Sequence, residues 1–188
     1  MKTDRLTLRQ LATRDADWIA RDIANPQVHR WITSPPYPYT LADAQAFVAD
    51  RADHPFYRVI ETEGVPCGVV SITEGDTADE DADIGYWLAQ RAWDRGIMTE
   101  AAEAMLDKYF ADHDVIESGW ITGNAASENV LTKLGFRRTG ETRMIWSHFH
   151  GQDMPVIRVR LDRATWAEVS RGRSHSHADT RGEESANA

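Results

Sequence analysis

The sequence predicts a single domain of the α/β class (mixed α+β). Its 188 residues correspond to one domain or a little more. Hydrophobic residues make up 41% of the chain and charged residues 27%, which is typical of a globular domain. Strand and helix patterns are mixed along the chain, mostly as neighbouring strands, with one strand–helix–strand unit over residues 84–122.

The chain is predicted to open with a short strand and a helix. Residues 3–10 alternate polar and apolar side chains, which is the period of a half-buried strand. Thr13 stands where a helix cap is expected, and apolar residues after it recur at helical spacing. We expect Asn25 and Pro26 to end that helix, because proline cannot continue the hydrogen-bond ladder.

A loop and a second helix are expected next. Residues 31–40 contain three prolines and three aromatic residues, a composition that excludes regular structure. Thr40 and Asp43 have the spacing of a capping box. A helix is therefore expected to begin there and to run to about Arg51.

The rest of the domain is expected to contain more strands than helices. The strands are predicted at 56–62, 66–73, 84–88, 115–122, 137–149 and 154–162. The helices are predicted at 96–111, 125–134 and 164–170. Gly64 marks a turn, and Gly135 follows a helix end as a glycine cap does. Residues 150–153 are expected to turn a hairpin, and the acidic stretch 74–83 to be a solvated loop.

The C-terminal segment differs in composition from the domain. From Arg171 onward the chain carries no apolar side chain larger than alanine. Such a segment cannot bury enough surface to offset the entropy lost on ordering. We therefore assign residues 1–170 to the domain and 171–188 to a polar, disordered tail. His175 and His177 lack a third ligand, so no metal site is expected.

The charge balance limits the classes of partner. Lys and Arg number 21 and Asp and Glu 30, which gives a net charge of −9. Nucleic-acid binding without sequence preference depends on neutralising phosphates with Lys and Arg, so this balance argues against a nucleic-acid partner. An acidic surface instead attracts cationic small molecules or basic peptides.

The single cysteine, Cys67, indicates a reducing compartment, because it excludes an intramolecular disulfide. Cys67 stands in an apolar strand and is expected to be a buried small hydrophobe. The first twenty residues lack the apolar run of a secretory signal, and no stretch is apolar enough to span a membrane. We therefore expect a cytoplasmic protein with no membrane partner.

Residues 91–101 have the pattern of a phosphate-binding loop. They follow a predicted strand and open a helix, so several backbone N–H groups point to one spot at the positive end of the helix dipole. Gly96 permits close approach, and Arg91 and Arg95 add positive charge. One glycine before a helix is also an ordinary turn. The loop lacks the Lys-Ser/Thr pair of a Walker loop and the glycines of a dinucleotide fingerprint.

A second segment, residues 123–141, follows the next strand. Together the two segments resemble the GNAT superfamily of acyl-CoA-dependent N-acyltransferases. Within it, the chain is most similar to the RimJ/RimL branch of ribosomal-protein N-terminal acetyltransferase-like proteins. The matching stretches are TDRLTLR at 3–9, DIGYWLAQRAWDRGIMTEA at 83–101, NAASENVLTKLGF at 124–136 and TGE at 139–141. The resemblance covers about residues 3–162.

The resemblance implies both a fold and an activity. The fold is a central twisted mixed sheet of six or seven strands, splayed near 115–122, with helices on both faces. The activity is transfer of an acetyl group from acetyl-CoA to a primary amine, by direct attack in a ternary complex and without a metal. The amine is a peptide or protein N-terminus or a small molecule, and a homodimer is compatible with this branch.

The resemblance also assigns cofactor contacts. Backbone amides and one hydroxyl are expected to cradle the CoA pyrophosphate: Arg95, Gly96, Ile97 and Met98, with Thr99 beside them. Trp93 takes the place of the first polar residue of the family pattern, and Asp94 stands where glycine is common. Asn124 corresponds to a contact with the pantetheine arm. Asn129 and Lys133 correspond to the adenine and 3′-phosphate end, although Lys133 is equally explained as a solvated lysine.

Ser127 resembles the family residue placed near the CoA sulfur, where a hydroxyl could protonate the departing thiolate. Many family members carry a tyrosine one turn later, where this chain has Leu131. The proton donor is therefore Ser127, a water or a residue not yet identified. Ser127 could also serve only to satisfy backbone amides at the start of its helix.

The acceptor must be a neutral amine to attack a thioester. At pH 7.4 an α-amino group with a pKa near 8 is roughly 20% neutral, and a lysine with a pKa near 10.4 roughly 0.1%. A peptide N-terminus therefore needs only a water path or a modest base. The candidate bases are Glu74, Asp83, His148, His150 and Asp153.

Two sets of residues are candidates for the acceptor wall. His148 and His150 alternate with Trp146 on a predicted strand, which would place all three on one face. The alternative is a hairpin end with solvated histidines. A second set in the proline-rich loop could form an aromatic lid or pack on the domain edge: Trp31, Tyr37 and Tyr39.

Two other functions stay open from the sequence. One is a non-catalytic CoA-binding or interaction module on the same fold, which would bind CoA without turning over any amine. The other is an aminoglycoside or polyamine acetyltransferase, which would need a densely acidic acceptor pocket.

Overall fold

The computed structural model describes residues 1–75 and 81–184, and side chains up to Arg173. The strands are β1 (Leu6–Arg9), β2 (Tyr57–Thr62), β3 (Val65–Thr73), β4 (Asp83–Leu88), β5 (Val115–Ile121), β6 (Arg137–Ser147) and β7 (Gln152–Asp162). The α-helices are α1 (Ala16–Ile23), α2 (Pro26–His29), α3 (Leu41–Arg51), α4 (Ile97–Tyr109), α5 (Ala125–Lys133) and α6 (Arg163–Glu184). Two 3-10 turns are η1 (Thr13–Asp15) and η2 (Gln90–Ala92).

The described strands form one seven-stranded sheet in the order β1-β2-β3-β4-β5-β7-β6. The β4–β5 pair is parallel and the other pairs are antiparallel. The parallel pair is joined through α4, which is the strand–helix–strand unit expected over 84–122. The predicted mixed α/β fold is confirmed.

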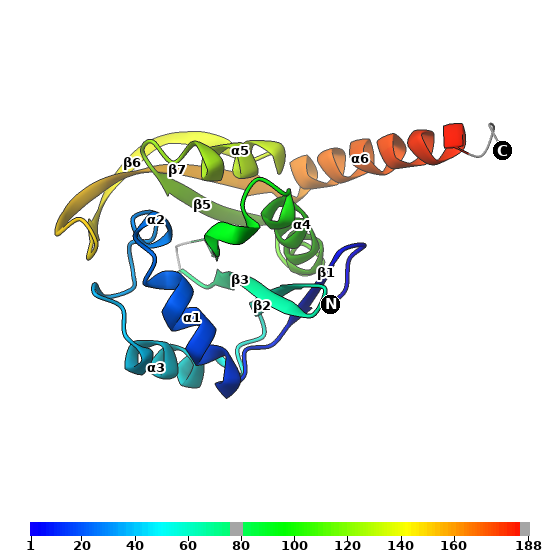
Figure 1. The fold of residues 1–188 in the computed structure, drawn as a ribbon. Helices are drawn as coiled ribbons and strands as arrows, with labels where there is room; N and C mark the ends of the chain where they lie inside the picture. The colour runs from blue at the N-terminus through cyan, green and yellow to red at the C-terminus, as the bar shows by residue number, and fades with distance from the viewer. Residues whose placement is uncertain (76–80, 185–188) are drawn as a thin grey trace.

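Helices cover both faces of the sheet (Figure 1). Successive side chains of a strand point to opposite faces, so each face takes every second residue. Val59 of β2 packs in the cluster formed with α1 and α3, while Ile60 packs in the cluster beneath α4. Val69 and Val70 of β3 divide in the same way. Burial on both faces explains why these strands have continuous apolar runs.

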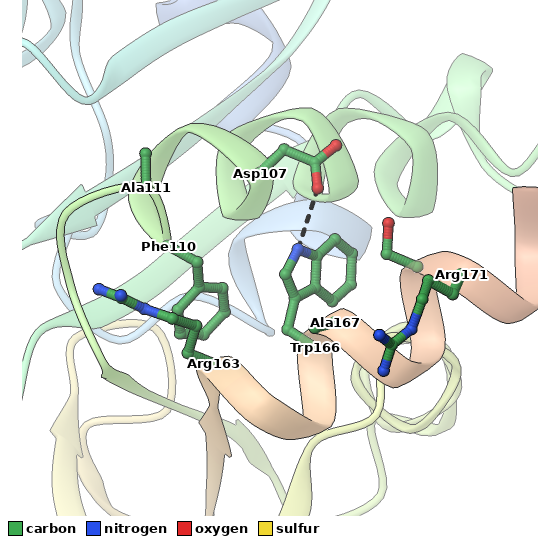
Figure 2. Close-up of a pocket in the computed structure, with 8 residues that line it drawn as sticks. Asp107, Phe110, Ala111, Arg163, Trp166, Ala167 and Arg171 are labelled. Carbon is green, nitrogen blue, oxygen red and sulfur yellow. Dashed lines mark hydrogen bonds between the residues drawn. The ribbon is translucent and has the colours of Figure 1, made fainter.

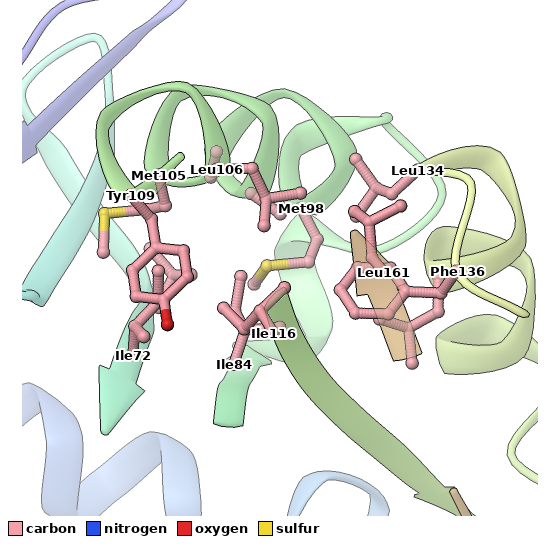
Figure 3. Close-up of a cluster of buried hydrophobic side chains, with 14 of the residues drawn as sticks. Ile72, Ile84, Met98, Met105, Leu106, Tyr109, Ile116, Leu134, Phe136 and Leu161 are labelled. Atoms are coloured by element: carbon pink, nitrogen blue, oxygen red, sulfur yellow. The ribbon is translucent and has the colours of Figure 1, made fainter. Parts of the chain in front are cut away.

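The larger core lies between the sheet and α4 (Figure 3). Met105 and Leu106 of α4 and Ile116 of β5 have no exposed surface. Burying one such side chain contributes about 1.5–3 kcal/mol. This packing fixes α4 against the sheet and therefore fixes where the N-terminus of α4 lies.

β4 and β5 separate soon after they meet. Their register pairs Asp83 with Glu117, and the Glu117 N–H donates to the Ala82 carbonyl at 2.8 Å. β4 pairs with β3 over its whole length, and β5 pairs with β7 over its whole length, but the register between β4 and β5 ends at this one pair. The sheet therefore splays at β5, as expected, and the ends of β4 and β5 flank a gap.

One helix boundary differs from the prediction. Asn25 and Pro26 were expected only to end α1, but they begin α2. The Asn25 side chain accepts a hydrogen bond from the Gln27 N–H at 3.0 Å. Pro26 stands in the first turn, where a missing N–H leaves no hydrogen bond unmade.

α6 extends beyond the expected domain end and projects from the sheet (Figure 1). The sequence predicts a tail from Arg171, but the helix continues to Glu184, because backbone hydrogen bonds within a helix do not require apolar side chains. Its described anchors are Trp166, which donates to Asp107 at 2.9 Å, and Arg173, which contacts Glu103 and the Lys133 carbonyl. Residues 185–188 lie outside the described residues, as do the side chains of His175 and His177, so disorder there stays a prediction.

A helix that crosses a membrane is long and apolar. Within 1–75 and 81–184, no helix combines the necessary length and apolar character.

Candidate active site

The loop before α4 has the backbone shape of an anion cradle. Gly96 is the N-cap of α4 with a φ of +71°, and Asp94 has a φ of +58°. The first turn of a helix leaves its N–H groups without intrahelical acceptors. A Cβ at Gly96 would lie 3.5 Å from Nη2 of Arg5, with no closer neighbour among the described atoms. The predicted loop is therefore present, and it lies where β4 ends.

The two apolar residues of this loop point away from it. Ile97 is 2% exposed and Met98 5% exposed, and both side chains belong to the core beneath α4. Figure 3 shows Met98 in this core. Their bulk therefore occupies the core, while their backbone N–H groups remain in the first helical turn. Thr99, in the same turn, is half-buried.

Trp93 has a structural contact. Its ring N–H donates to the Leu88 carbonyl at 3.0 Å, which ties the loop to the end of β4. This hydrogen bond occupies the only donor of the indole, so the ring N–H is not free for a cofactor. Arg95 is exposed, as a cation facing a bound phosphate would be.

Arg5 brings a second cation to the loop. Its Nη1 donates to the Arg95 carbonyl at 3.1 Å, and its Nη2 lies 2.6 Å from Glu100 Oε2. Burial alone raises the pKa of Glu100, but hydrogen bonds from Thr3 and Arg5 outweigh it and leave the pKa below its ordinary value. Arg5 was not a predicted site residue, because it lies 90 residues from Arg95 in the chain. Its one signal was its place in the matching stretch at 3–9.

The start of α5 lies on the other side of the gap. Asn124 caps this helix, and its side-chain oxygen accepts from the Ser127 N–H at 3.2 Å. The side-chain NH2 of Asn124 remains a donor for a ligand. Asn129 and Lys133 are exposed on the same helix, whereas Leu131 has no exposed surface. Leu131 is therefore a core residue, which explains why no polar group stands there.

A hydroxyl pair joins β4 to α5. The Tyr86 hydroxyl lies 3.0 Å from Ser127 Oγ and 3.4 Å from the Ser127 carbonyl oxygen. Burial raises the pKa of Tyr86 above its ordinary value, and Asp83 adds to that effect. Ser127 was a predicted site residue but Tyr86 was not, because its place in a strand gave no sign of a partner 41 residues away.

The predicted strand face of Trp146, His148 and His150 is wrong in one respect. β6 ends at Ser147, and residues 148–151 form the turn, so strand alternation does not apply to the two histidines. His148 is exposed, and Trp146 is 52% exposed. His150 is half-buried, and its Nε2 is 3.1 Å from the Arg30 carbonyl oxygen. The hairpin tip is therefore bound to the segment after α2.

The tip of the β6–β7 hairpin packs against aromatic rings through Phe149. The Phe149 ring packs against Tyr37 at 4.9 Å and against His29 at 5.8 Å between centroids. His29 has no exposed surface, its Nε2 bonds the Pro35 carbonyl at 3.2 Å, and burial lowers its pKa. The docking of Phe149 gives the physical reason for the early end of β6.

The three aromatic residues of the proline-rich loop do not form one group. Tyr39 is 9% exposed and packs in the core cluster of α1 and α3, where burial raises its pKa to about 12. Tyr37 is 48% exposed beside Phe149. Trp31 is half-buried under the Arg30 guanidinium, 4.7 Å from its ring centroid. Tyr39 thus packs inward, whereas Tyr37 and Trp31 remain candidates for acceptor contacts.

Two carboxylates near the gap share one buried arginine. Arg158 Nη2 lies 2.5 Å from Asp83 Oδ2 and 2.8 Å from Glu117 Oε2. Burial raises the pKa of Asp83 despite the attraction of Arg158. Asp83 is therefore more easily protonated than an ordinary aspartate, while the ion pair with Arg158 occupies its Oδ2. The other acidic candidates, Glu74 and Asp153, are exposed.

Other features of the described residues lie outside this site. Cys67 is buried as predicted, and burial raises the pKa of its thiol. In the described ranges, no three His, Cys, Asp or Glu side chains are grouped to hold a metal ion.

A groove of about 380 Å³ opens between α4 and α6 (Figure 2). Phe110 and Trp166 stack in its wall with ring centroids 6.4 Å apart. Phe110 is the C-cap of α4 and Trp166 belongs to α6, whereas Gly96 is the N-cap of α4. None of the predicted site residues lines this groove, which is therefore separate from the loop at Gly96.

Comparisons with known proteins show that the chain is similar to acetyltransferases. The family model described as an acetyltransferase (GNAT) domain matches residues 5–137. The uncharacterized N-acetyltransferase p20 of Bacillus licheniformis is 25% identical over 150 residues, which covers 75% of this chain and 84% of the relative.

Solved structures share the fold. Mycobacterium smegmatis RimJ in complex with CoA-disulfide has a TM-score of 0.70 at 23% identity, covering 84% of this chain and 81% of that chain. The ribosomal-protein-S5-alanine acetyltransferase from Vibrio fischeri has a TM-score of 0.70 at 20% identity, covering 88% of this chain and 97% of that chain.

Proposed function

Because the chain belongs to the acetyltransferase (GNAT) family, whose members transfer an acetyl group from acetyl-CoA to an amine, we propose that its acceptor is the α-amino group of a peptide or protein. The state of the candidate bases supports this choice. Asp83 is ion-paired with Arg158, and His150 is bound to the Arg30 carbonyl. Both groups are thus held by contacts within the protein, and an α-amino group is the acceptor that needs the least help from a base to become neutral.

The proposed cofactor site joins the two sides of the gap between β4 and β5. The amides at the start of α4 and the cations Arg5 and Arg95 hold the pyrophosphate, because both features favour an anion. Asn124 takes the pantetheine arm with its free side-chain donors, and Ser127 stands at the thioester end. Asn129 and Lys133, exposed on α5, take the adenine and 3′-phosphate end.

The proposed reaction is a direct transfer. The neutral amine nitrogen attacks the thioester carbonyl carbon, a carbon–nitrogen bond forms and the carbon–sulfur bond breaks. The departing sulfur takes a proton from the Ser127 hydroxyl, and Ser127 recovers one from solvent. The proton lost by the nitrogen passes to water, with His148 as the described candidate base that is exposed on the hairpin turn.

An amine panel tests this proposal. The panel contains one peptide with a free N-terminus, the same peptide with a blocked N-terminus and one lysine, spermidine, and an aminoglycoside. CoA thiol release and product mass are followed. We expect acetylation of the free N-terminus, with a rate that rises with pH up to about 8, the pKa of the α-amino group. Preference for spermidine or the aminoglycoside would contradict the acceptor class, and CoA binding without turnover would indicate a non-catalytic module.

A further inference from the structure

We propose that Tyr86 is a positioning residue for acetyl transfer, whose phenol orients the Ser127 hydroxyl toward the departing CoA sulfur. The inference rests on the proposed function of Ser127 as proton donor. It deepens that function, because it explains how a serine acts where Leu131 leaves no tyrosine on α5. The observation that carries it is the 3.0 Å contact between Tyr86 Oη and Ser127 Oγ.

The splay of the sheet brings Tyr86 to Ser127. Tyr86 packs on the same face of β4 as Ile84 and Leu88, the face covered by α4. Beyond the contact of the Ser118 hydroxyl with the Ile84 carbonyl at 2.8 Å, the two strands diverge, and the Tyr86 side chain reaches the first turn of α5. The hydroxyl pair is therefore built at the place where the acyl-CoA is expected to enter.

The relative acidity of the two hydroxyls indicates that Tyr86 donates to Ser127 in this hydrogen bond. A phenol, with an ordinary pKa of about 10, is a stronger acid than an aliphatic hydroxyl and is the better donor of the two. When Tyr86 donates to Ser127 Oγ, the Ser127 hydrogen is left to point elsewhere. The competing contact of Tyr86 with the Ser127 carbonyl is longer, at 3.4 Å, and therefore weaker.

Burial keeps Tyr86 in the donor state. Desolvation raises the pKa of its phenol, and this effect exceeds the opposing effect of the hydrogen bond with Ser127. Tyr86 therefore stays protonated at neutral pH and keeps its own proton throughout the reaction. As the Ser127 hydrogen moves to sulfur, negative charge develops on Ser127 Oγ, and a hydrogen bond to a charged oxygen is about twice as strong as one to a neutral oxygen. The contact is thus stronger in the transition state than in the ground state, which is the condition for raising kcat.

The alternative is that Tyr86 only fastens α5 to β4. A fastening role would affect stability or the binding of acetyl-CoA, whereas a positioning role would affect kcat. Three variants separate the two roles: Tyr86→Phe, Ser127→Ala and the double variant. Tyr109→Phe is the control, because it also removes a tyrosine hydroxyl that makes a hydrogen bond. The Tyr109 hydroxyl donates to the Val115 carbonyl at 3.0 Å and not to Ser127.

The experiment measures kcat and KM for acetyl-CoA with the same peptide acceptor, and Tm for each variant. We expect Tyr86→Phe to lower kcat about 10-fold and Ser127→Ala about 100-fold, with KM for acetyl-CoA within about twofold of wild type. The double variant should be no slower than Ser127→Ala alone, because Tyr86 acts through Ser127. Tyr109→Phe should keep the wild-type kcat.

Each other outcome overturns the inference. Additive losses in the double variant would show that Tyr86 acts independently of Ser127. A change in KM or Tm with kcat unchanged would assign Tyr86 to fastening. Full activity of Tyr86→Phe in an active protein would overturn this inference alone, whereas a wild type that turns over no amine would overturn the proposed function with it.

Discussion

The backbone at Asp94 is held in the left-handed region, with a φ of +58°. Glycine adopts this conformation freely, while an L-residue loses about 1–2 kcal/mol and aspartate somewhat less. The carboxylate also stands two residues before the N-cap of α4, where it would repel a bound pyrophosphate. The same position thus carries both backbone strain and an unfavourable charge.

We predict that Asp94→Gly strengthens acetyl-CoA binding. Removing the charge should lower the Kd about fivefold, which corresponds to about 1 kcal/mol. The change in stability should stay within about 1 kcal/mol, because the relief of strain is offset by the larger entropy of glycine in the unfolded chain. Calorimetric titration measures the Kd.

Glu63→Gly is the matched control for this variant. Glu63 has a φ of +52° in the turn between β2 and β3, so its replacement makes the same change in charge and backbone away from α4. Its Kd should equal that of wild type. Equal gains in the two variants would mean that net charge, rather than the position of Asp94, sets the affinity.

At the scale of elements, Asp15 ties β1 to α1. It is 1% exposed, accepts from Trp18 Nε1 at 2.8 Å and lies 2.7 Å from Arg9 Nη2. Burial alone raises the pKa of Asp15, but hydrogen bonds from Arg9, Trp18 and the Ala12 N–H outweigh it and leave the pKa below its ordinary value. A lowered folded pKa contributes stability above the unfolded pKa of about 3.9, and that stability is lost as pH falls through the folded value.

We therefore predict that Asp15→Asn lowers the free energy of unfolding by about 2 kcal/mol at pH 7, since it removes the charge from a buried hydrogen-bonded pair. The difference from wild type should shrink as pH falls below about 4, where Asp15 of the unfolded chain becomes protonated, and should be lost as pH falls through the lower folded pKa. Denaturant titrations at several pH values measure it. Asp17→Asn, at an exposed position of α1, should leave the wild-type value. A difference that stays constant down to the folded pKa and below would contradict the assignment.

Elements with a strong local signal were predictable. The capping box of Thr40 and Asp43 is present, because its two residues contact each other within one turn. The end of β6 was not predictable, because it depends on where Phe149 docks, and its partners His29 and Tyr37 lie more than a hundred residues earlier. Local periodicity therefore assigned the strand but misplaced its last residues.

At the scale of the whole molecule, the candidate site depends on contacts between distant segments. The loop at Gly96 was predictable, since a glycine between a strand and a helix is a local pattern. Arg5 and Tyr86 were not, because their partners lie 90 and 41 residues away and only the folded sheet brings them together. The splay between β4 and β5 lets Tyr86 reach Ser127, and it followed from the family resemblance rather than from the residues.

The net charge of the chain opposes the binding of an anionic cofactor, so the local charge at the start of α4 matters. With a net charge of −9, the surface repels an anionic cofactor at long range. Arg95 and the first turn of α4 place positive charge beside the Arg5–Glu100 ion pair, and local interactions dominate at distances below the Debye length of about 8 Å. Assembly into a dimer stays a prediction, which sedimentation of the purified chain would measure.

The central claim is that the N-terminus of α4 binds acetyl-CoA, and calorimetric titration of acetyl-CoA tests it most directly. The comparison includes wild type, Gly96→Trp and Gly64→Trp, which is a control because Gly64 has a similar φ of +76° and no neighbour within 4 Å of a Cβ. We predict a Kd on the order of 10 μM for wild type and Gly64→Trp, within the usual range for enzyme substrates. Binding should vanish in Gly96→Trp while its Tm stays close to that of the control. Equal binding by all three proteins, or no binding by wild type at millimolar acetyl-CoA, would contradict the claim.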